Sequence, residues 1–343
     1  MSHFTLLVVG DDIEGQMERY DENRSVPPYI ELQGEALDKE LKKALGWLWA
    51  AEALRSHADG RVDDRAVSLR KVIAKDTALD ALTLEQRFQL ASWWSGEDVE
   101  IREGEIVKYS TYNPDSKWDW YEIGGRWNGF FALKPGATGL PVKPHYSEAA
   151  NPPDKAGRTD QARKGDIDFD LMRTEAAVQA AQEFQLLQDA TEGIEPLTES
   201  WEAVMRRALG GLAETYFSEE NIPTSEETDK EIHVRISQAR EERNRHPFIQ
   251  AMRAAGLSLW GDPYETYCLG HEDPMTEYIR RARASATSTY AMLIDGEWVA
   301  RGEMGWFGMS RDDLDRETWG TKVAETIDGL PDDTLLTLVD CHI

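Results

Sequence analysis

The sequence predicts an α+β fold in which a mixed or antiparallel sheet carries helical insertions. Apolar runs of strand length stand near both ends of the chain, HFTLLVV at the beginning and TLLTLVDCHI at the end. A third β-prone segment covers residues 105–133, and the long stretches between these segments show helical spacing of apolar residues. We therefore expect both ends and the 105–133 segment to form one sheet, with a ferredoxin-like arrangement as the candidate topology.

This pattern divides the chain into a sheet core and two helical parts. The core is expected to combine residues 1–35, 97–170 and 286–343. Residues 36–96 then form a helical insertion, and residues 171–285 form a helical subdomain.

The first strand is closed by Gly10, and a short helix is expected directly after it. Asp11 or Asp12 would cap that helix, because a short carboxylate side chain accepts hydrogen bonds from the first backbone N–H groups. The proline pair in SVPPYIEL then favours an extended backbone.

Three helices are predicted in the helical insertion. Leucines recur every three, four or six residues between 36 and 56, with charged residues between them. Shorter helical patterns follow near 64–75 and 83–94, and Thr83 is a typical cap for the last of them. The block therefore has the pattern of an inserted helical unit.

Strand patterning returns in DVEIREGEIVKYST, where Glu103 and Gly104 form the expected turn. Residues 134–160 are rich in proline and glycine and predict a long loop, a kind of segment that is often functional or mobile. Two strong helical patterns follow, and Thr198 is the expected cap of the second.

The carboxyl-terminal part has the clearest pattern. Asp295 and Gly296 separate two β-prone runs, a typical hairpin sequence. A helical pattern at RDDLDRETWGTKVAETI then leads into the last strand.

The composition narrows the class of protein. No apolar run approaches the ~20 residues that a membrane span needs, and the first residues lack the pattern of a signal peptide. Cys268 and Cys341 are too few for a disulfide framework. We expect a protein of a reducing cytoplasm with no membrane contact.

The formal net charge is −26. So large an excess of carboxylates repels phosphate backbones, and direct nucleic-acid binding is therefore not expected. The same charge suits solubility, a basic protein partner, metal ions or imitation of a polyanion. A solvated acidic surface is the simplest interpretation.

The segment STYNPDSKWDWYEIGGRWNGFF holds the densest group of aromatic residues. Strand alternation would place Trp118, Trp120 and Glu122 on one face. Lys117, Asp119 and Tyr121 would then lie on the other.

The double glycine of this segment, Gly124 and Gly125, allows a sharp turn or the close approach of a ligand. Arg126 follows, and a guanidinium binds phosphate or carboxylate through two parallel hydrogen bonds. Stacking on indoles contributes ~1–3 kcal/mol per base in single-strand binders. Alternatively, the tryptophans pack in a core and Arg126 bridges Asp119 or Glu122. The predicted ligand-binding residues are Asn113, Lys117, Trp118, Trp120, Tyr121, Gly124, Gly125, Arg126, Trp127 and Trp306.

Asp166 and Asp168 form a candidate metal site. At positions i and i+2 of an extended segment they share a face, and carboxylate oxygens suit Mg²⁺ or Mn²⁺. The alternative is a solvated turn with aspartates at capping positions. The cofactor is therefore left open, with a divalent metal as the candidate.

The terminal VDCHI supplies candidate catalytic groups. Asp340 and His342 point the same way on a strand, whereas Cys341 points the other way into the core. A thiol and an imidazole on adjacent strand residues diverge, which argues against a Cys–His nucleophile. His3 lies on the first strand, a candidate neighbour of the last. The predicted acid–base candidates are Asp119, Asp340 and His342.

Several strings resemble a family of bacteriophage and prophage-encoded proteins. They are MSHFTLLVVGDD, YDEN and VPPY, YNPDSKWDWYEIGGRWNGFF, DQARKGDIDF, DGEWVARGEMGWFGM and LPDDTLLTLVDCHI. The likeness covers nearly all of the predicted sheet, with YNPxSKWDWYxIGGRW and a terminal DCHI as its motifs. It implies a phage gene acting in the host cytoplasm and carries over no catalytic residue.

These features predict a cytoplasmic phage protein that binds a small nucleotide-like or phosphorylated ligand in an aromatic and arginine pocket. Whether the protein also processes the ligand is left open, and a nucleotide signal of host defence would suit the context. One alternative is an acidic DNA mimic that inhibits a host nucleic-acid-binding enzyme, with that host protein as partner. Another is a structural component of the virion.

Overall fold

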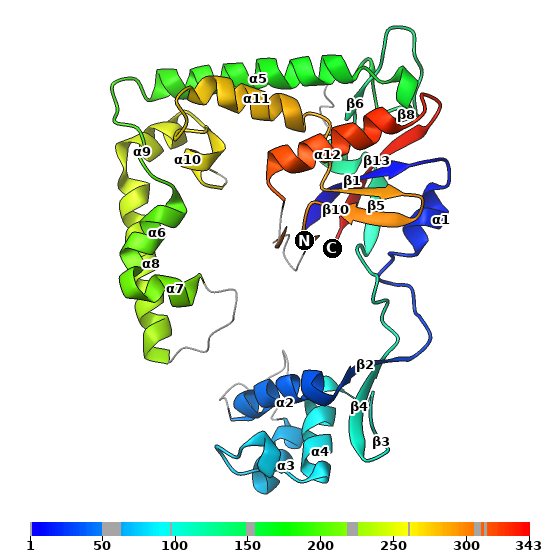
Figure 1. Ribbon diagram of the computed structural model, residues 1–343, viewed down its shortest axis with the longest axis vertical. Coiled ribbons are helices and arrows are strands. Elements are labelled where there is room, and N and C mark those ends of the chain that lie inside the picture. Colours follow the sequence, from blue (N-terminus) through cyan, green and yellow to red (C-terminus); the bar gives the residue numbers. More distant parts are fainter. Residues whose placement is uncertain are drawn as a thin grey trace. The chain divides into compact units, whose positions relative to one another are not determined.

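The computed structural model describes residues 2–49, 63–96, 98–148, 155–217, 226–259, 261–304, 310–311 and 314–343. It has the predicted α+β fold, with helices and mixed sheets (Figure 1). The chain forms two compact units, Glu18–Asp119 and a larger one that joins Met1–Met17 to Trp120–Ile343. The predicted ligand residue Trp306 lies outside the described residues.

The main sheet of the larger unit joins the two ends of the chain. Strand β1 (His3–Val9) lies between β13 (Leu335–His342), to which it is antiparallel, and β9 (Ala291–Ile294), to which it is parallel. The full order is β10-β9-β1-β13-β5, and β8 also pairs with β13. The remaining strands are β5 (Trp120–Ile123), β8 (Gln161–Arg163) and β10 (Glu297–Ala300).

The pairing of both ends in one mixed sheet agrees with the predicted fold class, but a ferredoxin-like arrangement is not confirmed. The segment 105–133 also divides differently from the expectation. Its residues Trp120–Ile123 enter the main sheet, whereas β6 (Phe131–Ala132) pairs with β7 (Arg158–Thr159). The first strand of the segment, Glu105–Ser110, belongs to a separate sheet in the smaller unit.

One face of the main sheet is apolar in its middle and polar toward the strand ends. Leu7, Leu338 and Met292 lie in the core of this unit. Helix α12 (Arg316–Gly329) contributes Val323 and other apolar residues to the same core, and α5 (Phe169–Ala190) contributes Met172. Because residues two apart share a face, this face continues toward the strand ends with polar residues.

Helices α5 and α11 (Pro274–Ser285) lie side by side in the larger unit (Figure 1). A second core, with Phe184, Phe248 and Met252 among its buried residues, packs α5 against α9 (Pro247–Ala254), α10 (Pro263–Thr266) and α11. A separate apolar cluster of Leu209, Ala213 and Ile232 joins α6 (Trp201–Leu209), α7 (Ala213–Tyr216) and α8 (Glu226–Arg245).

Local signals set several ends of these elements. Ser200, not Thr198, caps α6, because its side chain accepts a hydrogen bond from the backbone N–H of Ala203 at 3.2 Å. Asp295 and Gly296 have φ angles of 51° and 78°, which suit the predicted tight hairpin between β9 and β10. The other short elements are α1 (Ile13–Glu18), β11 (Glu303–Met304) and β12 (Ser310–Arg311).

The smaller unit packs three helices against a sheet of its own, in the order β2-β4-β3. Leu41, Leu90 and Ile106 are among the residues of its core. Thr83 caps the third helix in a capping box with Gln86, as its position predicted. The elements are β2 (Tyr29–Gln33), α2 (Gly34–Leu48), α3 (Asp64–Val72), α4 (Leu84–Ser95), β3 (Val99–Arg102) and β4 (Glu105–Ser110). In the part of the chain that the structure describes, no helix combines the length and apolarity needed to cross a bilayer.

Candidate functional site

Asp340 is the centre of the candidate site. Its side chain on β13 is 1% exposed, and each of its two oxygens has a partner from a distant part of the chain. Oδ1 lies 2.8 Å from Nδ1 of His3, and Oδ2 accepts a hydrogen bond from the backbone N–H of Arg126 at 2.9 Å. This buried carboxylate therefore joins the first strand, the last strand and the double-glycine turn.

The contact with Asp340 sets the state of the His3 ring. An ionised carboxylate only accepts hydrogen bonds, so Nδ1 of His3 is the nitrogen that donates. Nε2 is then the ring nitrogen available for proton exchange or for a ligand, as in other histidines oriented by a carboxylate. The side chain of His3 is 10% exposed, so its ring is close to solvent without being freely solvated.

Two more rings adjoin His3. The ring of His342 lies edge-on at a centroid distance of 4.9 Å, and the indole of Trp120 lies at 6.0 Å. The register explains this group, because His3 and Trp120 are the two strand partners of His342. We call His3, Trp120, Arg126, Asp340 and His342 the Asp340 corner.

Gly125 allows Asp340 to reach the turn. A Cβ atom on Gly125 would lie less than 3.0 Å from the Asp340 carboxylate, and its φ of +50° disfavours any other residue. The turn itself is a short 3-10 helix, Gly125–Trp127. The close approach expected of this glycine is therefore made by a carboxylate of the same chain.

Gly124 faces a second buried carboxylate, that of Asp160, which a Cβ atom would also contact too closely. Oδ1 of Asp160 accepts hydrogen bonds from the backbone N–H groups of Gly129 at 2.6 Å and Phe130 at 3.1 Å. Burial raises the pKa of Asp160 and outweighs these two hydrogen bonds, which lower it. Two carboxylates thus pack against the turn, Asp160 beside Gly124 and Asp340 beside Gly125.

Arg126 and Trp120 are the open parts of the corner. The Arg126 side chain is exposed, and among the described residues it has no ion-pair partner, so neither Asp119 nor Glu122 neutralises it. Trp120 is 48% exposed. Glu122 is the register partner of Asp340 and brings an exposed carboxylate to the same strand face. The corner therefore presents an exposed indole beside two imidazole rings, and the exposed Arg126 side chain extends from the turn that Asp340 holds.

The predicted site residues of the aromatic segment divide between the two units. Asn113, Lys117, Trp118 and Asp119 belong to the smaller unit, whereas β5 begins at Trp120. The expected common strand face of Trp118 and Trp120 is therefore wrong, since Trp118 precedes the strand.

Asn113 and Trp118 have structural contacts in the smaller unit. The amide of Asn113 donates to the carbonyl oxygens of Arg19 at 2.7 Å and Asp21 at 3.0 Å. Trp118 is 7% exposed and forms a β-bridge with Asp21. Both side chains are buried and are therefore not available to line a ligand-binding pocket.

Tyr121 and Trp127 belong to the larger unit but pack at other positions. Tyr121 is the register partner of Cys341, on the sheet face opposite to Asp340. Cys341 is fully buried, and burial together with the neighbouring Asp340 raises the pKa of its thiol. Trp127 packs partly buried against the main core. Burial and the raised pKa therefore disfavour a thiolate at Cys341.

Asp168 caps helix α5, because its side chain accepts a hydrogen bond from the backbone N–H of Leu171 at 2.8 Å. Asp166 ends a short 3-10 helix before it. Across the described ranges, no group of three or more His, Cys, Asp or Glu side chains is arranged to hold a metal ion. Magnesium or manganese at these two aspartates stays a prediction.

Sequence reasoning did not assign a role to Asp160 and left His3 without one. Asp160 is the last residue of a long loop without regular hydrophobic spacing. Nothing in the sequence links it to Gly124, 36 positions earlier. The alternation in VDCHI correctly placed Asp340 and His342 on one face, and His3 follows from pairing of the two ends. Comparison with protein-family models, curated proteins and solved structures finds no match to this chain.

Proposed function

We propose that the Asp340 corner binds a small nucleotide-like or phosphorylated ligand. In this proposal the exposed guanidinium of Arg126 binds the anionic group, and the half-exposed indole of Trp120 stacks on the ring of the ligand. The resemblance in sequence gives the context of a phage protein in the host cytoplasm, where a nucleotide signal of host defence is the candidate ligand.

The observation that carries the proposal is the double use of the Asp340 carboxylate. It fixes the His3 ring through Oδ1 and the backbone at Arg126 through Oδ2. The imidazole and the backbone from which the Arg126 side chain extends are therefore held in place before a ligand arrives. Such preorganisation reduces the entropy lost on binding. Nε2 of His3 is then the ring nitrogen that would accept a hydrogen bond or a proton from the ligand.

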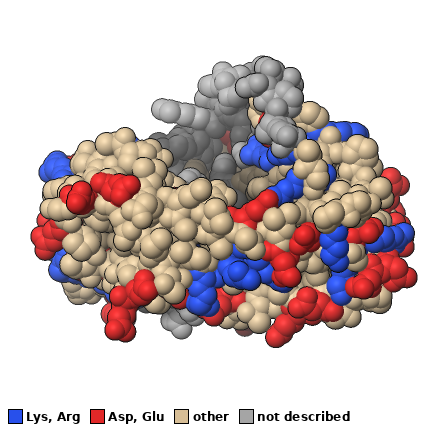
Figure 2. Space-filling model, turned by 90° about the horizontal axis from the view of Figure 1, so that it is seen from above, with Lys and Arg blue, Asp and Glu red and all other residues tan. Residues whose placement is uncertain are grey.

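The acidic-mimic alternative requires carboxylates in a continuous stripe at phosphate-like spacing. On the face seen in Figure 2, blue Lys and Arg side chains are interspersed among the red Asp and Glu side chains. This face therefore does not favour the mimic, which stays a prediction, as does the virion component.

The proposal is tested by the Arg126→Ala variant in a thermal-shift assay with ATP, GTP, UTP, CTP and the cyclic mononucleotides. A nucleotide that binds the corner should raise the melting temperature of the wild-type protein and leave the variant unchanged. Without ligand the two melting temperatures should agree within a few degrees, because the Arg126 side chain is exposed. Native mass spectrometry of the fresh protein would identify a ligand that co-purifies.

The matched control is Arg173→Ala on α5, where Arg173 forms an exposed ion pair with Asp170 and has no part in the corner. This variant should respond to nucleotides as the wild type does. A nucleotide response that survives in Arg126→Ala contradicts the proposal. A large fall in the unliganded melting temperature would instead identify Arg126 as a structural clamp.

A further inference from the structure

A cavity of about 330 Å³ in the helical part of the larger unit is lined by three arginines, although the chain has a net charge of −26. Arg240 and Arg243 come from α8, and Arg253 comes from α9. Trp201 and Asp262 also line it. We call this cavity the arginine pocket.

Asp262 gives the arginine pocket a fixed frame. Its Oδ2 accepts a hydrogen bond from the first backbone N–H of α6, on Trp201, at 2.6 Å, and its Oδ1 accepts one from Tyr264 of α10 at 3.1 Å. Arg243 forms an ion pair with the same carboxylate, and the two side chains are 12% and 14% exposed. The guanidinium of Arg243 also lies 5.8 Å from the centre of the Trp201 ring. Three helices are thus tied together at the floor of the pocket.

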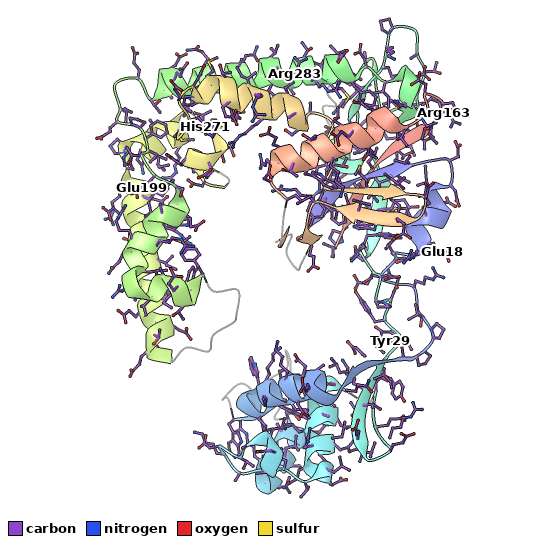
Figure 3. All side chains as sticks on the ribbon, in the orientation of Figure 1. Glu18, Tyr29, Arg163, Glu199, His271 and Arg283 are labelled. Carbon is purple, nitrogen blue, oxygen red and sulfur yellow. The ribbon has the colours of Figure 1, made fainter. Side chains whose placement is uncertain are left out.

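Arg240 and Arg253 differ from Arg243 in having no such partner. Both side chains are exposed at the pocket, and neither has a carboxylate partner among the residues that the structure describes. Asp262 neutralises Arg243, so these two guanidinium groups leave the lining with two uncompensated positive charges. Glu199, labelled in Figure 3, does not cancel them, because its carboxylate pairs with Arg207.

The lining also includes apolar residues. Ile249, Leu259 and Pro263 contribute hydrocarbon surface beside the Trp201 indole. The volume falls near the lower end of the ~300–1,000 Å³ that is typical of small-molecule sites. A fitting ligand therefore combines a doubly negative group with one flat, partly apolar ring.

We propose that the arginine pocket binds an aromatic or heterocyclic phosphomonoester, such as a nucleoside monophosphate. Arg240 and Arg253 bind the phosphate, because guanidinium groups form paired, charge-assisted hydrogen bonds with its oxygens. The ring lies against Ile249, Leu259 and Trp201. This site is separate from the Asp340 corner and does not depend on it.

The test measures binding of AMP, inorganic phosphate and adenosine to the full chain by isothermal titration calorimetry. AMP should bind more tightly than either of its two parts. Arg240→Ala and Arg253→Ala should each weaken AMP binding about tenfold or more, since each removes hydrogen bonds to a charged group. Added salt should weaken binding as well.

Arg245→Ala is the matched control, because Arg245 is also on α8, pairs with Glu241 and does not line the pocket. It should bind AMP as the wild type does, and so should Arg126→Ala, which separates this site from the corner. No binding of AMP, or binding that both pocket variants retain, overturns the proposal. Equal affinity for AMP and inorganic phosphate would contradict the proposed contact of the ring with Ile249, Leu259 and Trp201. Circular dichroism of each variant verifies that the exposed substitutions leave the fold intact.

Discussion

Two buried carboxylates explain why the turn after β5 contains two glycines. Asp160 occupies the space beside Gly124, and Asp340 occupies the space beside Gly125. Each carboxylate accepts backbone hydrogen bonds from the residues that follow, so the turn satisfies groups that burial would otherwise leave without partners. The double glycine is therefore a requirement of the fold around the corner.

At the residue scale we predict that Gly125→Ala destabilises the larger unit by about 2 kcal/mol or more, since it adds a Cβ atom against Asp340 and forces alanine into a left-handed conformation. Urea unfolding measures this loss of stability. The Gly125→Ala substitution should also weaken any nucleotide response of the corner, because the backbone at Arg126 would move.

Gly329→Ala, at the end of α12, is the control for this substitution. No atom lies within 4 Å of a Cβ placed there, and φ is not positive. Its unfolding free energy should stay close to that of the wild type. Equal stability of the Gly125 variant and the control would show that the carboxylate can move aside without cost.

The glycine pair shows what sequence could predict at this scale. A close approach to Gly124 and Gly125 followed from the residue type, because only glycine has no Cβ atom. The partner did not follow, since Asp340 is 214 positions away from Arg126 and its contact depends on strand pairing. From the residue type alone, the glycines were therefore expected to serve a sharp turn or the close approach of a ligand.

At the element scale, Asp63 joins two helices of the smaller unit. Its side chain caps α3 through the backbone N–H groups of Arg65 and Ala66 and accepts a hydrogen bond from Nε1 of Trp93 on α4 at 2.9 Å. Burial alone would raise the pKa of Asp63, but these hydrogen bonds, with Trp93 the largest, outweigh it and lower the pKa.

We predict that Asp63→Ala costs about 2 kcal/mol or more, from loss of the cap and from the indole N–H left without its acceptor. A carboxylate with a lowered folded-state pKa stabilises the fold above its ordinary value of 3.8, and this contribution disappears as the pH falls through the folded-state value. The difference between wild type and variant, measured by urea unfolding, should therefore shrink in acid.

Asp64→Ala is the control for this prediction, because Asp64 is the next residue and the indole N–H of Trp93 donates to Asp63. We expect a small loss of stability at neutral pH. If both variants lost the same amount, the link between α3 and α4 would contribute nothing beyond general helix charge.

Element identity was more predictable than element pairing. Period-two patterns located the terminal strands, and helical patterns over 36–56 and near 83–94 located helices that the structure shows at Gly34–Leu48 and Leu84–Ser95, because each pattern is local. The partners of Glu105–Ser110 and Trp120–Ile123 were not predictable, since both segments are β-prone and nothing local separates their sheets. The arginine pocket was missed for a similar reason, because its residues come from four helices and from the segment between α9 and α10.

At the scale of the whole molecule, the unit Glu18–Asp119 has a core of its own and its own small sheet. We predict that a fragment covering residues 18–119 folds without the rest of the chain, because its buried apolar residues are supplied from within it. Circular dichroism should show helix and a cooperative thermal transition, and an NMR spectrum should show dispersed amide signals.

The Asp63→Ala substitution in this fragment is the control, and it should lower the transition temperature of the fragment as it does in the full chain. A fragment with no cooperative transition would show that its core needs the larger unit.

The contact between His3 and Asp340 spans 337 positions of sequence. Almost every other element must therefore be synthesised before this pair can close, and loop closure over such a span is slow compared with local folding. A ribosome that stalls at any point between them releases a chain with half of the pair. Translation products that end before Asp340 therefore cannot form the Asp340 corner, whatever else they fold into.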